Sequence, residues 1–291
     1  MIYFSFLNNF IDISYCTQKK HTYMRSPVGL REGEYFGTVV KSLDNPLFTC
    51  SLTSYGPNTA IKRHYHENSY ISLLVKGAYE EKNKTDDKLL ETGQAIFRPG
   101  IYSHANDFQF QGGTCFNIEF KKTGIEQLDY SFTVPEKMNL YPSGSLSSIY
   151  RLFHYFIQDA QEDLYTELIL DVFNEIGRGP AGKTSLPWIG CVKDILENEH
   201  EEHHTIHSIA GRVFVHPVYM ARAFKEQTGY TLGEYQLIHK LRKTISFLLN
   251  TGMPLNEIAF RTGFYDPAHF THSFKMMYGL SPKKFRLLAK S

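Results

Sequence analysis

One stretch near the C-terminus decides the predicted fold of this chain: Glu257-Ile258-Ala259-Phe260-Arg261-Thr262-Gly263-Phe264-Tyr265-Asp266-Pro267-Ala268-His269-Phe270-Thr271-His272-Ser273-Phe274-Lys275. Apolar residues recur at helical spacing before Gly263, which is expected to end that helix. Asp266 is suited to cap a second helix, and Pro267 fits a first helical turn because no N–H is needed there. The stretch therefore predicts a helix, a tight turn and a second helix.

The second of these helices has two distinct faces. Its inner face is predicted to hold Phe270, Phe274 and Met277. The residues left on the outer face are mostly polar, namely Ala268, His269, Thr271, His272 and Lys275. A helix with this distribution presents one face to a partner.

A related unit lies upstream, where Ile206 begins a helical pattern and a second helix runs from Pro217 to Gln227 before Gly229. The inner face of that second helix is predicted to hold Met220, Ala223 and Phe224, and the outer face holds Val218, Tyr219, Arg222 and Lys225. A long apolar-striped helix between Tyr235 and Leu249 joins the two units.

Residues 188 to 286 resemble the DNA-binding domain of AraC/XylS-type transcription regulators. The matching positions are Ile209-Ala210, Arg222, Phe224-Lys225, Gly229, Leu241, Ile258-Ala259, Gly263-Phe264, Asp266, Phe270, Phe274-Lys275, Gly279, Ser281-Pro282 and Phe285-Arg286. The departures are His216 for a capping Ser, Lys240 and Thr244 for an Arg and an Ala in the linking helix, and His272 for an Arg.

This resemblance implies two recognition helices that read successive major grooves, about 34 Å apart, on one face of DNA. In the first unit we expect Arg222 to contact a base edge, Val218 and Tyr219 to add contacts, and Lys225 to contact phosphate. The structural alternative for Arg222 is an ion pair with Glu226 one turn later. In the second unit the candidates are the outer residues Ala268, His269, Thr271, His272 and Lys275.

The N-terminal part predicts short strands separated by turn residues, as in an antiparallel sandwich or small barrel. The clearest strands are Phe36 to Val40, Phe48 to Leu52, Tyr70 to Val75, Ala95 to Phe97 and Cys115 to Phe120. The charge run Glu80-Glu81-Lys82 is interpreted as a solvated hairpin end.

Within these strands His64, His66, Gly77, Gly93, Pro99 and His104 resemble the two motifs of the cupin barrel. In that family two histidines of the first motif, one of the second and a glutamate hold a divalent metal, and Tyr70 stands here in place of the glutamate. We therefore favour a small-molecule effector pocket at His64, His66, Tyr70 and His104 without a cofactor. A divalent metal on the three histidines is the alternative.

The middle of the chain changes to a helical period between Ser143 and Ile176, which predicts two helices. Two roles are open for their apolar stripes: pairing across a dimer, or packing against the chain's own barrel. The Gly- and Pro-rich segment that follows predicts a linker. The expected domains are a barrel at 24–140, a helical segment at 141–177, a linker at 178–187 and a DNA-binding domain at 188–291.

Composition is ordinary for a globular chain of 291 residues, with 42% hydrophobic and 21% charged residues. Residues 188 to 291 hold 13 Lys or Arg against 9 Asp or Glu, which makes this part basic and the rest mildly acidic. The four cysteines form no CxxC pair, and the first residues fit neither a signal peptide nor a membrane span. A reducing cytoplasm is the expected location, with translation starting at Met1 or at Met24.

The predicted fold class is α+β, with an N-terminal cupin-like antiparallel barrel, a helical middle and an all-α C-terminal domain with two helix-turn-helix units. The predicted function is sequence-specific, effector-controlled transcription regulation, and the alternative is a metal-dependent cupin enzyme fused to a DNA-binding tail. No nucleophile triad or phosphate loop is present. The expected partners are double-stranded DNA, a small-molecule effector, RNA polymerase and a second copy of the chain, with no membrane.

Overall fold

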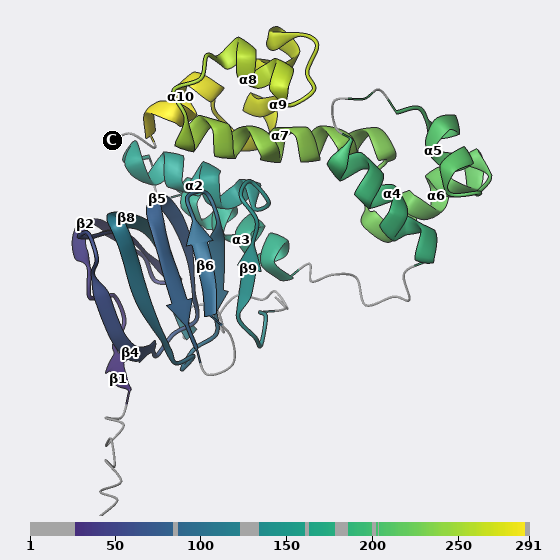
Figure 1. The fold of residues 1–291 in the computed structure, drawn as a ribbon. Helices are drawn as coiled ribbons and strands as arrows, with labels where there is room; N and C mark the ends of the chain where they lie inside the picture. The colour runs from purple at the N-terminus through teal and green to yellow at the C-terminus, as the bar shows by residue number, and fades with distance from the viewer. Residues whose placement is uncertain are drawn as a thin grey trace, which may run out of the picture.

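The computed structural model describes residues 27–83, 87–122, 134–160, 163–177, 186–199, 202 and 204–288. It has a mixed α+β architecture, with a sheet in the N-terminal part and helices in the C-terminal part (Figure 1). The predicted domain start at residue 24, the two alternative start residues and most of the predicted linker lie outside the described residues.

The described residues of the N-terminal part form one nine-stranded sheet, in which the strand order along the main path is β1-β4-β8-β5-β7-β9. Strand β3 also pairs with β8, β2 pairs with β3, and β6 pairs with β5. The strands are β1 (Val28–Leu30), β2 (Thr38–Asp44), β3 (Phe48–Tyr55), β4 (Ala60–His66), β5 (Tyr70–Lys82), β6 (Asp87–Glu91), β7 (Ala95–Arg98), β8 (His104–Phe120) and β9 (Asn139–Tyr141).

The long strands β5 and β8 organise this sheet. They pair antiparallel from Tyr70 opposite Glu119 to Lys82 opposite Ala105, with two register shifts between. All other described strand pairs are also antiparallel except β1 with β4. The predicted antiparallel strands are thus present, and their closure into a cupin barrel stays a prediction.

The two helices of the middle segment are α2 (Ser147–Ile157) and α3 (Asp163–Gly177). Their apolar stripes are buried in the same core as Phe48, Phe116 and Phe120 of the sheet. Phe153 and Phe156 of α2 pack against the Phe116 ring at centroid distances of 5.2 and 5.1 Å. These stripes therefore cover the chain's own sheet, which is the second of the two roles considered for them.

The C-terminal part contains seven helices within the described residues, and several of these helices begin or end at the residues that the sequence predicted. They are α4 (Pro187–Asn198), α5 (Ile206–Arg212), α6 (Pro217–Thr228), α7 (Leu232–Asn250), α8 (Leu255–Arg261), α9 (Pro267–Tyr278) and α10 (Pro282–Leu288). Gly229 ends α6 with φ of 80°, and the Asp266 side chain caps α9 by accepting from the N–H groups of Ala268 and His269. We call α5–α6 the proximal pair and α8–α9 the distal pair.

These helices belong to two separate hydrophobic cores. Helices α4, α5 and α6 form the proximal core with the start of α7, where Leu232 lies. The other end of α7, with Leu241, Ile245 and Leu248, belongs to the large core that also contains the distal pair, α10, α2, α3 and the sheet. Figure 1 shows α7 running between the two groups. Burial therefore crosses the predicted domain boundary at residue 188.

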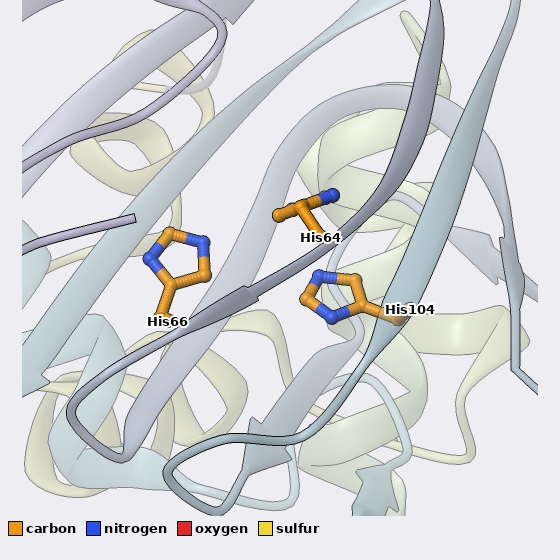
Figure 2. A group of neighbouring side chains, drawn as sticks. All are labelled: His64, His66 and His104. Atoms are coloured by element: carbon orange, nitrogen blue, oxygen red, sulfur yellow. The ribbon is translucent and has the colours of Figure 1, made fainter. Parts of the chain in front are cut away.

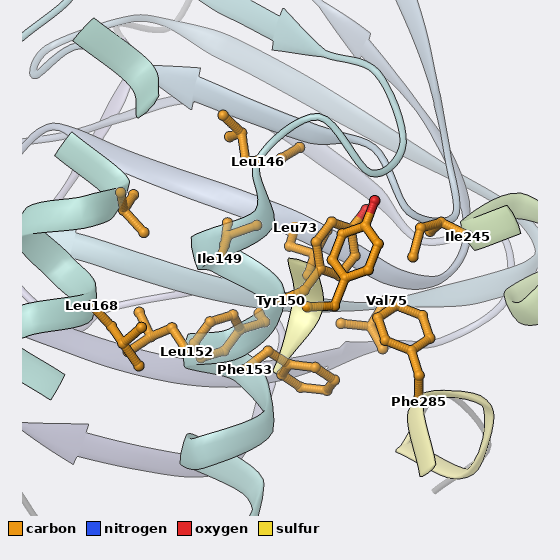
Figure 3. Packing of buried hydrophobic residues seen from close by; sticks show 14 of the residues in the cluster. Leu73, Val75, Leu146, Ile149, Tyr150, Leu152, Phe153, Leu168, Ile245 and Phe285 are labelled. Atoms are coloured by element: carbon orange, nitrogen blue, oxygen red, sulfur yellow. The ribbon is translucent and has the colours of Figure 1, made fainter. Parts of the chain in front are cut away.

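The contact between the distal helices and the N-terminal part is specific. The Tyr278 hydroxyl of α9 donates to the Gly144 carbonyl at 3.1 Å, and the Gly144 N–H donates to the Tyr150 hydroxyl at 2.9 Å. Phe285 of α10 packs on Tyr150 with ring centroids 5.5 Å apart, beside Val75 and Leu73 of β5 (Figure 3). At Gly144, with φ of 76°, an added Cβ would lie 2.8 Å from the Arg242 Cα of α7. The two parts are closely fitted at this point.

Candidate DNA-reading face and effector pocket

The outer face of α6 is exposed as predicted, because Met220, Ala223 and Phe224 fill the proximal core. Val218 is 72% exposed and Tyr219 52%, and Lys225 is also exposed. The Tyr219 ring lies beside Trp188 of α4 with centroids 6.2 Å apart. The four predicted contact residues thus share one solvent-facing surface.

Arg222 makes the ion pair that was considered as its structural alternative. Its Nε donates to Glu226 Oε1 at 3.0 Å, one turn along α6. The two side chains are 81% and 63% exposed, so the pair is a surface contact of small net strength. An exposed arginine held this loosely is free to exchange its carboxylate partner for a base edge or a phosphate.

The outer face of α9 is likewise exposed. Phe270 and Phe274 are fully buried in the large core, whereas all five predicted contact residues lie in solvent, namely Ala268, His269, Thr271, His272 and Lys275. The contact with the N-terminal part uses other residues of α9, including Tyr278. Docking of the distal pair therefore leaves its predicted reading face uncovered.

The three predicted pocket histidines come together in the N-terminal sheet, two from β4 and one from the start of β8. One ring nitrogen from each lies within 4.8 Å of those of the other two, and all three residues are buried (Figure 2). His64 Nδ1 faces the Lys62 carbonyl at 2.9 Å and His104 Nδ1 faces the Tyr102 carbonyl at 3.1 Å. Because a carbonyl only accepts, both Nδ1 atoms carry the proton and both Nε2 atoms are acceptors.

Burial keeps these imidazoles neutral. It lowers the pKa of His64 to about 4 and the pKa of His66 to about 3. The pKa of His104 is lowered well below its usual value, first by burial and then by the nearby Arg98 charge. The cluster therefore offers neutral acceptor nitrogens near neutral pH.

Tyr70, which stands where the cupin resemblance predicts a carboxylate ligand, contacts His104 Nε2 through its hydroxyl at 3.0 Å. Since that nitrogen accepts, the tyrosine hydroxyl donates to it and occupies the lone pair that a metal would need. The Arg98 guanidinium also lies 5.0 Å from the Tyr70 ring centroid. Three imidazoles alone suit a divalent metal, but this set with Tyr70 and Arg98 fits a hydrogen-bonding pocket better than a metal centre.

The floor of the pocket is a buried ion pair that the sequence interpretation missed. Arg98 Nε donates to Glu81 Oε1 at 2.9 Å, and Arg98 also donates to the Tyr79 hydroxyl at 2.9 Å and to Ser72 Oγ at 3.2 Å. Glu81 is fully buried and accepts from Asn106 at 3.1 Å. The expectation that Glu81 belongs to a solvated hairpin end was therefore wrong.

The alternation of inward and outward side chains along β5 explains why Glu81 is buried. The strand continues past Gly77, and its period of two directs Tyr79 and Glu81 inward while Glu80 and Lys82 remain partly exposed. The sequence signal for the burial of Glu81 was its spacing from Tyr79, because residues two positions apart in a strand lie on the same face of the sheet.

The cavity above this floor has about 350 Å³ of space between its atoms, part of it open to solvent. It is lined by Tyr35, Phe36, Tyr55, Ile61, His64, His66, Tyr70, Ser72, Tyr79, Arg98, Asn106, Phe108, Cys115 and Asn117. Its walls combine aromatic rings with polar side chains that face the same space, among them His64, Arg98 and Asn117.

Comparison with protein families matches residues 209–287 to a helix-turn-helix domain. The chain carries an AraC-type helix-turn-helix domain. The AraC-type domain also aligns with the multiple antibiotic resistance protein MarA of Escherichia coli, with 26% identity over 99 residues that cover 34% of this chain and 78% of MarA. The family resemblance predicted from the sequence is thus confirmed.

Two further similarities extend beyond the AraC-type domain. The uncharacterized HTH-type transcriptional regulator YisR of Bacillus subtilis is 24% identical over 191 residues, which cover 63% of this chain and 66% of YisR. ToxT from Vibrio cholerae O395 aligns in structure over 85% of this chain and 100% of that chain, with 12% identity and a TM-score of 0.36.

The Bacillus subtilis relatives are longer than the aligned part of this chain, which spans 66% of YisR and 28% of YtdP. Both are transcriptional regulators by name. Among the described residues, no helix combines the length and the apolar character that crossing a bilayer requires.

Proposed function

We propose that this protein is a sequence-specific transcription regulator in which α6 and α9 read DNA and the N-terminal pocket binds a small effector. The observation that carries the proposal is the AraC-type domain with two exposed helix faces, one on each side of α7. As a 19-residue helix, α7 is about 28 Å long, which suits two readers placed about one turn of DNA apart. RNA polymerase as a partner, a homodimer and a cytoplasmic location stay predictions.

The effector class follows from the pocket chemistry. His64 Nε2 is an acceptor, and the buried charges of Arg98 and Glu81 already neutralise each other. A small, uncharged ligand with hydroxyl or N–H donors suits this site. The second candidate, a metal-dependent enzyme, is disfavoured by the contact of Tyr70 with His104.

Strand β5 offers a direct route from the pocket to the distal pair. Tyr70 and Ser72 line the pocket, while Leu73 and Val75 belong to the core shared with α10. A ligand that shifts β5 therefore moves the surface on which the distal pair packs. This movement changes the position of the distal pair relative to the proximal pair. Within the described residues the proximal core contains no residue of the sheet, so we expect it to respond only through α7.

Arg222→Ala is expected to weaken binding to a preferred DNA sequence by about 1 to 3 kcal/mol, because a bidentate contact with guanine is lost. The test is fluorescence anisotropy on a duplex enriched from a random library by the wild-type protein. Loss of preference at one base position should accompany the loss of affinity.

Two matched variants serve as controls on the same duplex. Glu226→Ala removes the ion-pair partner of Arg222 and should leave specific binding intact. Lys225→Ala should weaken binding evenly across sequences and reduce the salt dependence of log K by about one. Undiminished binding and unchanged preference for Arg222→Ala would remove this arginine from the proposed reading face.

A further inference from the structure

The turn of the proximal pair contains an unusual residue. Phe214, between α5 and α6, has φ of 54°, a left-handed conformation that side chains with a Cβ rarely adopt. The residue is nevertheless 95% exposed, so the strain is not offset by burial within the chain. An aromatic side chain that costs backbone strain and is exposed over nearly all of its surface calls for a function outside the folded chain.

The distal turn shows what the fold alone requires at this position. In the proximal turn the Val215 N–H donates to the Ala210 carbonyl at 3.1 Å, and in the distal turn the Phe264 N–H donates to the Ala259 carbonyl at 2.9 Å. The residue before each donor is the left-handed one, and in the distal turn it is Gly263 with φ of 81°. Phe214 thus stands where the equivalent turn uses glycine, the residue without strain there.

The neighbourhood of Phe214 indicates its partner. Three residues separate it from Val218, which is followed by Tyr219, and both are exposed in the first turn of α6. The start of a recognition helix is the part that reaches base edges, and apolar side chains there contact the thymine methyl group in the major groove. Arg222 and Lys225 supply positive charge on the same helix.

We propose that Phe214 is a specificity-determining residue that packs its ring on a thymine methyl group beside the proximal reading helix. This inference rests on the proposed DNA-binding function. The strained conformation then holds the ring out toward the DNA, and the exposed apolar surface is buried only in the complex. The distal turn, with Gly263, has no such contact, so the thymine preference belongs to the proximal half-site.

The test compares full-length Phe214→Gly, Phe214→Ala and wild-type protein on the duplex enriched by the wild type. Phe214→Gly should raise the midpoint of thermal unfolding, because glycine relieves the left-handed strain, yet lower affinity about 5- to 30-fold. Phe214→Ala should lose as much affinity without the gain in stability. Phe110→Ala, which truncates a 71% exposed phenylalanine of β8, is the matched control and should change neither.

A second measurement identifies the contact itself. Replacing thymine by deoxyuracil, one position at a time, removes only the methyl group. Wild-type protein should lose affinity at one proximal position, and Phe214→Ala should be insensitive at that position. Equal affinity of the wild type and both Phe214 variants would overturn the inference while leaving the proposed function in place. Failure of the wild-type protein to enrich any sequence would overturn both.

Discussion

Arg98→Met is expected to lower the free energy of unfolding of the N-terminal part by about 3 to 5 kcal/mol, because it leaves the Glu81 carboxylate buried without its partner. Arg98 is 2% exposed and Glu81 is fully buried, so water cannot replace the lost contact at low cost. The variant also deprives Tyr79 and Ser72 of their donor. We expect effector binding to be lost together with stability, since these groups form the pocket floor.

Chemical denaturation followed by far-ultraviolet circular dichroism measures this change. The one tryptophan, Trp188, packs against the proximal core and reports separately on that part by fluorescence. The matched control is the double variant Glu81→Met with Arg98→Met, which removes both charges and should recover much of the loss. A loss below about 1 kcal/mol for Arg98→Met would show that the pair is not buried as described.

Acid is expected to destabilise the protein through the three pocket histidines. Their pKa values lie near 4 for His64, near 3 for His66 and well below the usual value for His104, against about 6.5 in the unfolded chain. Below about pH 6.5 the unfolded state therefore binds protons that the folded state does not. Stability falls as the pH is lowered, by about 2.5 kcal/mol each for His64 and His66 near pH 4.5, and His104 acts in the same direction.

Single variants isolate this effect from the rest of the chain. The raised pKa values of Glu119, which is buried, and of Glu175, which is half-buried, act in the opposite direction, but they contribute equally to wild type and variant. His64→Gln should therefore show a shallower decline of the urea midpoint between about pH 6.5 and 4.5 than wild type. Parallel profiles for the two proteins would mean that His64 is solvated or protonated in the fold.

The local signals of the C-terminal helices were predicted well because each lies within a few residues. Asp266 followed by Pro267, and Gly229 after an amphipathic run, fix helix ends through short-range hydrogen bonds and backbone preferences. The same holds for the faces of α6 and α9, since a period of 3.6 separates buried from exposed positions without knowledge of the partner.

The features that were not predicted depend on the register between strands and on the docking of helices far apart in the sequence. The Glu81–Arg98 pair requires β5 and β7 to lie in one sheet, with residues 17 apart in sequence brought together. The docking of α9 and α10 on α2 uses Tyr278 and Phe285, which look like ordinary core residues in the sequence. Periodicity shows that such residues are buried, but not against which part of the chain.

The central claim, a DNA reader in two parts joined by α7, is tested most directly by hydroxyl-radical footprinting of the wild-type protein on its enriched duplex. The claim predicts two protected segments on one face of the DNA, about 10 base pairs apart, from a single chain. Lys275→Glu, on the distal face, should remove one segment and leave the other. A single protected segment in the wild type, or loss of both segments in this variant, would contradict the account.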